Sequence, residues 1–191
     1  MPHLPGGPGP RTKENRMSFV RFLPHALIIA VLCFVLMTVT QLEGMGTYLV
    51  SWAIFQTWAL YFMAGANLKA GAKAAVCYIL GGAASVLIFR LTGALGGGPS
   101  APIVLTLVAS SVAFVIICLE KVPAINFIPG YFIGAGTFFA LASMPPTRSH
   151  GELMLVLTIT VLAGGLLGWL TVVGRTFYGK WLAGATAEEK K

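Results

Sequence analysis

Six apolar stretches, each about 20 residues long and joined by short polar segments, follow one another along this chain. A helix of about 20 residues is the length that a bilayer core of roughly 30 Å requires. Only 10% of the residues are charged, whereas a soluble domain carries about 25%. The sequence therefore predicts an all-α integral membrane protein with one membrane domain, residues 22–174, made of six transmembrane helices at about 22–42, 46–66, 72–92, 101–119, 125–143 and 153–174.

The two ends of the chain differ from this domain in composition. Residues 1–21 are rich in Pro, Gly and basic side chains and predict a disordered cytoplasmic tail, and residues 175–191 predict a second basic tail. Lys and Arg collect in the cytoplasmic loops of membrane proteins. With the N-terminus inside, only Arg90 and Arg148 fall outside. We therefore expect an even number of spans with both termini in the cytoplasm, together with the other Lys and Arg residues: Arg11, Lys13, Arg16, Arg21, Lys69, Lys73, Lys121, Arg175, Lys180, Lys190 and Lys191.

Closely spaced glycines predict where the helices pack. The fifth stretch, residues 126–143, reads NFIPGYFIGAGTFFALAS and places Gly130 and Gly134 four residues apart. Glycines at this spacing let two helix backbones approach closely, because lipid gives apolar side chains no reason to associate. Gly164 and Gly168 repeat the spacing in the sixth stretch. We expect these four glycines to lie at helix–helix contacts.

The chain also resembles itself. A shift of 77 positions places Leu42-Glu43 on Leu119-Glu120 and Phe55 on Phe132, and after a six-residue insertion Gly81-Gly82 falls on Gly164-Gly165. This pattern predicts two repeats of three spans each. Because three is odd, the repeats must be inverted relative to each other, an arrangement common in transporters, where sites form near the middle of the membrane. The other interpretation is an old duplication that is retained only for packing.

Several classes of chemistry are not expected. The chain has no Asp, and none of its six Glu lies at the centre of a predicted span. Charged groups inside a membrane usually mark ion pathways or proton relays, so a proton-coupled pump is disfavoured. No catalytic motif, clustered metal ligands or phosphate-binding loop is present, and the basic residues lie at span ends rather than among exposed aromatics. We expect neither enzyme activity nor a cofactor or metal, and no nucleic-acid partner.

Neutral polar residues remain as candidates for a pathway through the membrane. Gln56 is costly to place in lipid and is expected to face the bundle interior, whereas Ser and Thr hydroxyls can also bond to their own helix. A Pro-Gly pair near a membrane end frees backbone groups that need partners, which the neighbouring Asn126 could supply. The candidate lining residues are Gln56, Thr57, Asn126, Pro129, Gly130 and Thr137.

Two carboxylates end the first and fourth predicted spans. Glu43 and Glu120 fall on equivalent repeat positions, and an inverted arrangement would place them on opposite faces of the membrane. They could form the two mouths of one pathway. They could equally be hydrated carboxylates at the level of the lipid headgroups.

Three segments resemble a known family. The runs FIPGYFIGAGTFFA, GGLLGW and WALYFMAGANLKAG are similar to those of small bacterial inner-membrane proteins in the family of unknown function number 1097, which includes YcdZ-like proteins. The similarity covers roughly residues 25–182. It implies an integral protein of the bacterial inner membrane. The family has no established activity, so the resemblance assigns no functional residue.

The sequence supports two functional hypotheses of different classes. The first is a passive channel or facilitator for a small neutral solute or weak acid, since no charge is predicted inside the membrane. The second is a non-transporting membrane subunit or assembly partner, whose small-residue faces dock other helices. The expected partners are the lipid bilayer, a small solute in the first case, and either a second copy or another membrane protein.

Overall fold

The computed structural model describes residues 13–98 and 101–188, with side chains described for 22–98 and 101–182. This part of the chain is all-helical, with six α-helices and two short 3₁₀ helices. In chain order they are α1 Lys13–Thr40, η1 Met45–Thr47, α2 Ser51–Met63, α3 Leu68–Ala94, α4 Pro102–Cys118, η2 Leu119–Lys121, α5 Ile128–Ala142 and α6 His150–Glu188. Four stretches within the described residues are long and apolar enough to cross a membrane: Phe22–Thr40, Leu68–Ala94, Pro102–Lys121 and His150–Leu182.

Both predicted tails are partly helical. Helix α1 begins at Lys13, within the predicted tail 1–21, and α6 continues to Glu188, within the predicted tail 175–191. Residues 13–21 are thus helical, in contrast to the predicted disorder, and this segment contains no Pro. The predicted basic tail at 175–191 forms the last turns of α6 as far as Glu188. With 39 residues, α6 is about 58 Å long, roughly twice the thickness of a bilayer core. Residues 1–12 and 189–191 lie outside the described part.

The second and fifth helices are shorter than the predicted spans 46–66 and 125–143. Helix α2 has 13 residues and α5 has 15, which corresponds to about 20 Å of rise each. Helix α2 ends at a turn in which Gly65 and Ala66 both have positive φ, at 117° and 54°. Gly65 suits that backbone because it has no Cβ to clash. In α5 the helix begins only at Ile128, because Pro129 occupies its first turn.

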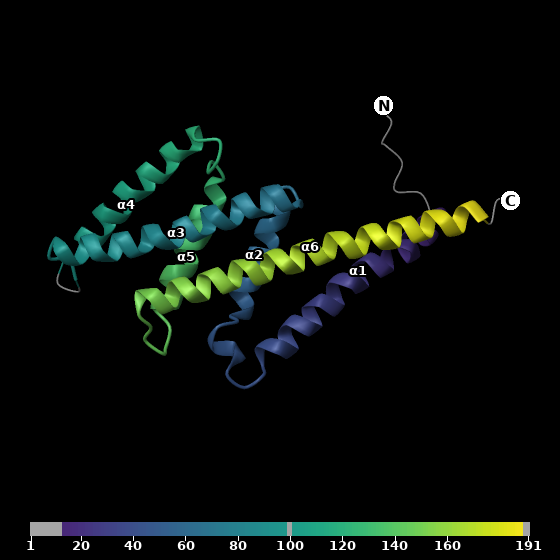
Figure 1. Cartoon of the computed structure of the whole chain (residues 1–191), viewed down its shortest axis with the longest axis horizontal. Helices are drawn as coiled ribbons and strands as arrows, with labels where there is room; N and C mark the ends of the chain where they lie inside the picture. Colours follow the sequence, from purple (N-terminus) through teal and green to yellow (C-terminus); the bar gives the residue numbers. More distant parts are fainter. Residues whose placement is uncertain (1–12, 99–100, 189–191) are drawn as a thin grey trace, which may run out of the picture.

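The long helices form one layer and the short helices a second (Figure 1). Helices α3 and α6 run in opposite directions and pack against each other, and in this view they pass in front of α5 and α2 respectively. Helix α1 packs on α6 and α4 packs on α3, and in this view the two helices of each pair are close at one end and diverge toward the other. Each outer helix and each short helix therefore packs mainly on a long helix of the other half of the chain.

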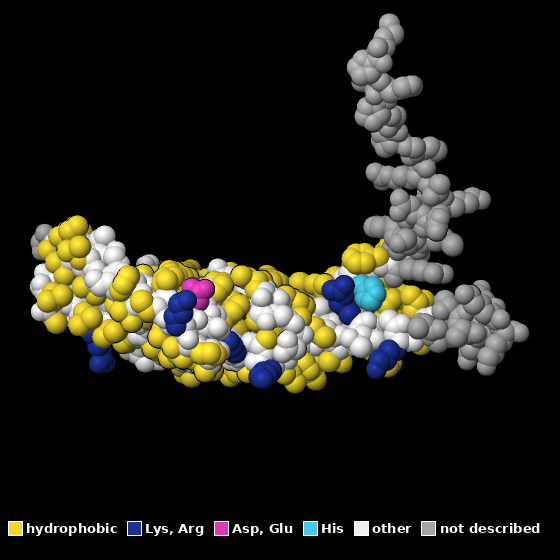
Figure 2. Space-filling model, turned by 90° about the horizontal axis from the view of Figure 1, so that it is seen from above, with side chains coloured by type: hydrophobic (Ala, Val, Ile, Leu, Met, Phe, Trp, Pro, Cys, Tyr) yellow, Lys and Arg dark blue, Asp and Glu magenta, His cyan; other side chains and the backbone are white. Residues whose placement is uncertain are grey.

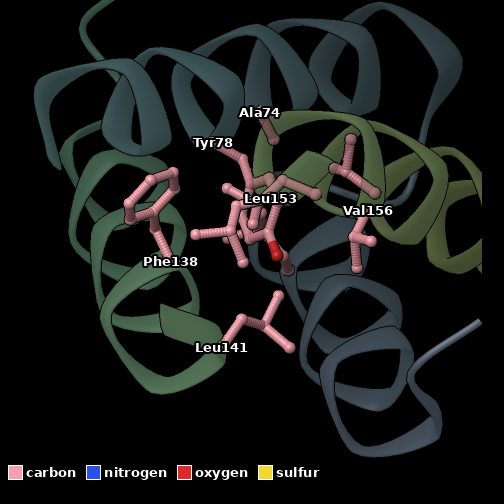
Figure 3. Close-up of a cluster of buried hydrophobic side chains, with 9 residues drawn as sticks. Ala74, Tyr78, Phe138, Leu141, Leu153 and Val156 are labelled. Carbon is pink, nitrogen blue, oxygen red and sulfur yellow. The ribbon is translucent and has the colours of Figure 1, made fainter. Parts of the chain in front are cut away.

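The hydrophobic core lies where the two long and the two short helices meet (Figure 3). Leu60 comes from α2, Ala74 and Tyr78 from α3, Phe138 and Leu141 from α5, and Leu153, Val156, Leu157 and Val161 from α6. Helices α1 and α4 contribute little to it, since Leu36, Val108 and Ile116 are their only buried hydrophobic side chains within the described residues. The core thus depends on helices from both halves.

The outer surface is apolar. Hydrophobic side chains cover most of the face seen in Figure 2, with a few Lys and Arg between them. Phe34 on α1 and Phe114 on α4 are each 72% exposed. Exposed apolar area of this extent marks contact with a partner or a membrane, and together with the four long apolar helices it identifies a membrane protein.

Candidate functional site

A short row of polar side chains leads from the core to the surface at the place where the short helices cross. The Thr137 hydroxyl on α5 lies 3.2 Å from the Gln56 amide oxygen on α2, and 2.8 Å from the carbonyl oxygen of Ile133 on its own helix. The Tyr78 hydroxyl on α3 lies close to the Thr137 side chain. Tyr78 and Thr137 are buried, whereas Gln56 is exposed. The expectation that Gln56 faces the interior was wrong: its amide reaches inward only to Thr137.

Thr57 joins α2 to α6. Its hydroxyl donates to the carbonyl oxygen of Thr160 at 2.9 Å, and a Cβ added to Gly164 would lie 2.0 Å from the Thr57 oxygen. The missing side chain of Gly164 therefore leaves the space that the Thr57 hydroxyl occupies. Thr57 is 1% exposed, so it binds the helices together within the core.

Helices α3 and α5 touch backbone to backbone through glycines. A Cβ on Gly134 would lie 1.9 Å from the carbonyl oxygen of Tyr78, and one on Gly81 would lie 2.1 Å from the carbonyl oxygen of Tyr131. A Cβ on Gly130, one turn before Gly134, would lie 2.8 Å from the Cβ of Cys77 and 3.1 Å from the carbonyl oxygen of Ala74. No residue other than glycine fits these three positions unless the helices move apart.

Gly168 belongs to a second contact of α6 with α2. A Cβ there would lie 2.5 Å from the ring of Tyr61, and a Cβ on Gly71 of α3 would lie 2.6 Å from another edge of the same ring. The Tyr61 ring is thus held between two glycines on the two long helices. The faces that contain Gly130, Gly134, Gly164 and Gly168 are therefore occupied by helices of this chain.

Asn126 and Pro129 lie apart from the crossing. The Asn126 side chain accepts a short hydrogen bond from the Lys73 ammonium at the start of α3. Pro129 is in the first turn of α5, where its missing N–H has no acceptor within the helix in any case. The Pro-Gly pair, which was expected to free backbone groups that Asn126 would bind, therefore starts the helix instead. Thr137 follows Pro129 by eight residues, or about 12 Å of helix.

A substitution at Pro129 checks this correction. We expect Pro129→Ala to change the free energy of unfolding by less than about 1 kcal/mol, because the first turn of a helix accepts either residue. Denaturation by SDS in mixed micelles measures the change, with Pro123→Ala in the preceding loop as the control. A loss of more than about 2 kcal/mol at Pro129 alone would show that the ring has a structural role beyond starting the helix.

The two candidate mouths are exposed. Glu43 lies in the loop after α1, and Glu120 lies in η2 after α4. In Figure 1 the loop after α1 is at the lower edge of the molecule and the end of α4 is at the upper edge. The structure therefore separates these carboxylates from each other and from the polar groups at the crossing.

Buried hydroxyls are the polar groups that sequence reasoning missed. Within the described residues the oxygens of four side chains are buried and make no hydrogen bond of normal length: Tyr78, Thr92, Tyr131 and Thr160. Buried polar groups without partners are rare in proteins and call for an explanation. The spacing of Tyr78, Gly81, Ser85 and Thr92 along one face of α3 was the signal that could have indicated Tyr78 and Thr92.

The arrangement suits hydrogen bonding to an uncharged molecule. Tyr78, Thr137 and Gln56 offer hydroxyl and amide groups, which both donate and accept. The described residues contain no group of three His, Cys, Asp or Glu that could hold a metal ion. The crossing therefore presents neutral polar chemistry, with apolar side chains around it.

Comparison with known proteins places the chain in a family. The sequence profile described as "Protein of unknown function (DUF1097)" matches residues 26–182, which includes all the buried residues of the core cluster. No curated protein and no solved structure is significantly similar to the chain. The resemblance to family number 1097 is thus confirmed, and the chain belongs to the DUF1097 family of proteins of unknown function.

Proposed function

We propose that the protein is a passive facilitator for a small neutral solute or weak acid, with its binding position at the crossing of α2 and α5. The observation that carries this proposal is the Tyr78 hydroxyl, which lies in a fully buried side chain without a hydrogen bond of normal length. Leaving such a group unpaired costs about 1–3 kcal/mol. A passing solute that hydrogen-bonds there would recover this energy during transit.

The chemistry around Tyr78 favours an uncharged cargo. The two polar side chains that continue from it, Thr137 and Gln56, are neutral. Tyr78 itself belongs to the hydrophobic core cluster. An ion would lose its hydration without gaining an opposite charge, whereas a neutral molecule loses less. A weak acid fits in its protonated form.

We propose that the two halves of the membrane domain are inverted repeats. Three pairs are equivalent in this scheme: α1 with α4, α2 with α5, and α3 with α6. Helices α2 and α5 then make the same contact, each on the long helix of the other half. The glycine contacts support the scheme in detail, since Gly81 approaches the carbonyl of Tyr131 and Gly164 approaches that of Ile54. Ile54 and Tyr131 are 77 positions apart, as in the repeat.

We also propose six crossings of the membrane, although α2 and α5 are short. Helices α1 and α3 run in the same direction in Figure 1, from right to left, so α2 must carry the chain back between them. Helices α4 and α6 run from left to right, and α5 returns the chain in the same way. If the four long helices cross a bilayer, the two short ones therefore cross as well.

The orientation that we propose places both termini in the cytoplasm of a bacterial cell, with the protein in its inner membrane. Lys69 and Lys73 lie at the start of α3, and Arg175 and Lys180 lie in the last part of α6. Because α3 and α6 are antiparallel, these basic residues lie toward the same end of the pair. The excess of basic residues at that end supports a cytoplasmic location for it.

Solute flux into liposomes tests the proposal. Stopped-flow light scattering with the purified protein would compare water, glycerol, urea, ammonia and short-chain acids. We expect faster flux for one solute class, and a roughly 2- to 10-fold reduction in Tyr78→Phe, because one hydrogen bond contributes about 0.5–1.5 kcal/mol. This variant removes a single unpaired oxygen, so its stability is expected to stay equal or to rise.

Tyr48→Phe is the matched control, since Tyr48 is exposed outside the core and its loss is expected to leave flux unchanged. Flux that is equal in Tyr78→Phe and in the unmodified protein would place the pathway elsewhere. A folded protein that accelerates no solute in the panel would argue against transport altogether.

A second candidate function is that of a non-transporting subunit that docks a partner helix. The helix faces that contain Gly130, Gly134, Gly164 and Gly168, which the sequence suggested for docking, are already covered by other helices of this chain. The feature that favours docking instead is an open apolar groove between α2, α3 and α6, of about 300 Å³, lined by Leu60, Tyr61, Ala72, Leu162 and Trp169 among others. Copurification of one stoichiometric membrane partner, together with a flat solute panel, would favour this function.

A further inference from the structure

The exposed face of the short helices carries an amide whose hydrogen-bonding capacity is largely unused. Gln56 is the sixth of the 13 residues of α2 and is exposed on the outside of the layer. Its only hydrogen-bond contact among the described residues is with Thr137. A carboxamide has two N–H donors and an oxygen with two lone pairs, so one contact leaves at least one donor and one acceptor free, whichever way the amide is turned.

An amide in this position needs a partner in the membrane. No water is available in the hydrocarbon core, and each unsatisfied polar group there costs several kcal/mol. Several other exposed polar side chains of the spans, such as Thr38 and Thr106, avoid this cost by bonding to a carbonyl of their own helix. Ser111, in the middle of α4, donates its hydroxyl proton to the carbonyl of Leu107 on its own helix at 2.9 Å. Gln56 reaches no such carbonyl.

The surface around Gln56 is shaped for close approach by another helix. Ala59 on α2 and Gly136 on α5 are both exposed, and a Cβ added to Gly136 would meet nothing within 4 Å. Phe55 precedes Ala59 by four residues and Phe132 precedes Gly136 by four, which places each pair on one face of its helix, and both rings are exposed. Small residues that are flanked by large apolar ones are typical of helix–helix interfaces in membranes, where the small ones let backbones come near.

We propose that a second copy of this chain covers this face, with a two-fold axis passing beside the two Gln56 side chains. An amide is complementary to itself: its N–H pairs with the oxygen of a second amide while its oxygen accepts in return. A two-fold interface requires a patch of this self-complementary kind. Both halves of the chain contribute equivalent residues to this face, since Phe55 and Ala59 correspond to Phe132 and Gly136 in the repeat. The dimer does not depend on whether the protein carries a solute.

The dimer is tested by counting subunits in large vesicles over a range of protein-to-lipid ratios, by single-molecule photobleaching. We expect Gln56→Leu to weaken dimerisation about tenfold, the effect of losing about 1–2 kcal/mol of interhelical hydrogen bonding. Ser111→Leu is the matched control, because it replaces an exposed polar residue on α4 that is already satisfied, and its dimer population is expected to be unchanged.

Disulfide trapping in native membranes locates the interface. The background would be Cys33→Ala with Cys118→Ala, which leaves the buried Cys77 in place. Ala59→Cys is expected to form a product of twice the monomer mass, and Ser111→Cys is expected not to. Three results would each overturn the proposal: equal dimerisation of Gln56→Leu and the unmodified protein, equal trapping at both positions, or trapping of Ala59→Cys only with a different protein.

Discussion

Gly134→Ala is expected to destabilise the protein strongly, whereas Gly136→Ala, two residues further along the same helix, is expected to preserve its stability. A Cβ on Gly134 would lie 1.9 Å from the carbonyl oxygen of Tyr78 and 2.8 Å from its carbonyl carbon. These are backbone atoms, so no side-chain rotation relieves the clash, and α3 and α5 must separate. Overpacking typically costs about 1–3 kcal/mol. We expect about 3 kcal/mol or more here, a large part of the roughly 5–15 kcal/mol that stabilises a domain.

Gly136 provides the control because an added Cβ there meets nothing within 4 Å. Alanine is favoured over glycine inside a helix by roughly 0.5–1 kcal/mol, so Gly136→Ala should be neutral or slightly stabilising. Unfolding in SDS mixed micelles, followed by tryptophan fluorescence, measures both variants. The larger substitution Gly134→Leu should abolish both the fold and any solute flux. If a Gly134 variant were as stable as the Gly136 one, the close contact of α3 with α5 would be wrong.

The sequence predicted the class of protein because membrane-spanning helices leave a strong signal. Long apolar stretches without charges admit few other structures in a chain with 10% charged residues. The ends of the helices were harder to predict. Pro129 and Gly130 were expected to free backbone groups within the membrane, because the sequence does not say whether a Pro starts a helix or breaks one. The tails were assigned by composition, although residues 13–21 and 175–188 contain nothing that prevents helix formation.

The candidate site could be predicted only in part. Gln56 and Thr137 were both recognised as polar residues inside apolar stretches, but their contact joins residues 81 positions apart. Nothing in either helix alone specifies this partner. Tyr78 was missed because an aromatic residue in an apolar helix resembles ordinary core or interface packing. Its buried hydroxyl became notable only once the surrounding helices were in place. Asn126 was assigned to the same pathway as Gln56 because both are neutral amides, whereas in the structure its side chain accepts a hydrogen bond from Lys73.

The second large effect is expected at two glycines in different halves of the chain. Gly81→Ala and Gly164→Ala should each destabilise the protein by about 3 kcal/mol or more, since both place a Cβ against backbone atoms of a short helix. For Gly81 the nearest atom is the carbonyl oxygen of Tyr131 at 2.1 Å. For Gly164 the atoms include the Trp58 nitrogen at 2.6 Å and the Ile54 oxygen at 2.8 Å, beside the Thr57 hydroxyl at 2.0 Å.

Gly165→Ala is the matched control, because an added Cβ there meets nothing within 4 Å and the change should gain roughly 0.5–1 kcal/mol of helix stability. The same SDS titration compares all three variants. Inverted repeats require Gly81 and Gly164 to behave alike, since each is the point where a long helix receives the short helix of the other half. If Gly164→Ala lowered the free energy of unfolding strongly and Gly81→Ala did not, the two halves would resemble each other in sequence but not in structure. Equal losses of stability in Gly81→Ala and Gly164→Ala, with none in Gly165→Ala, would mean that the same glycine contact joins the two halves at two equivalent places.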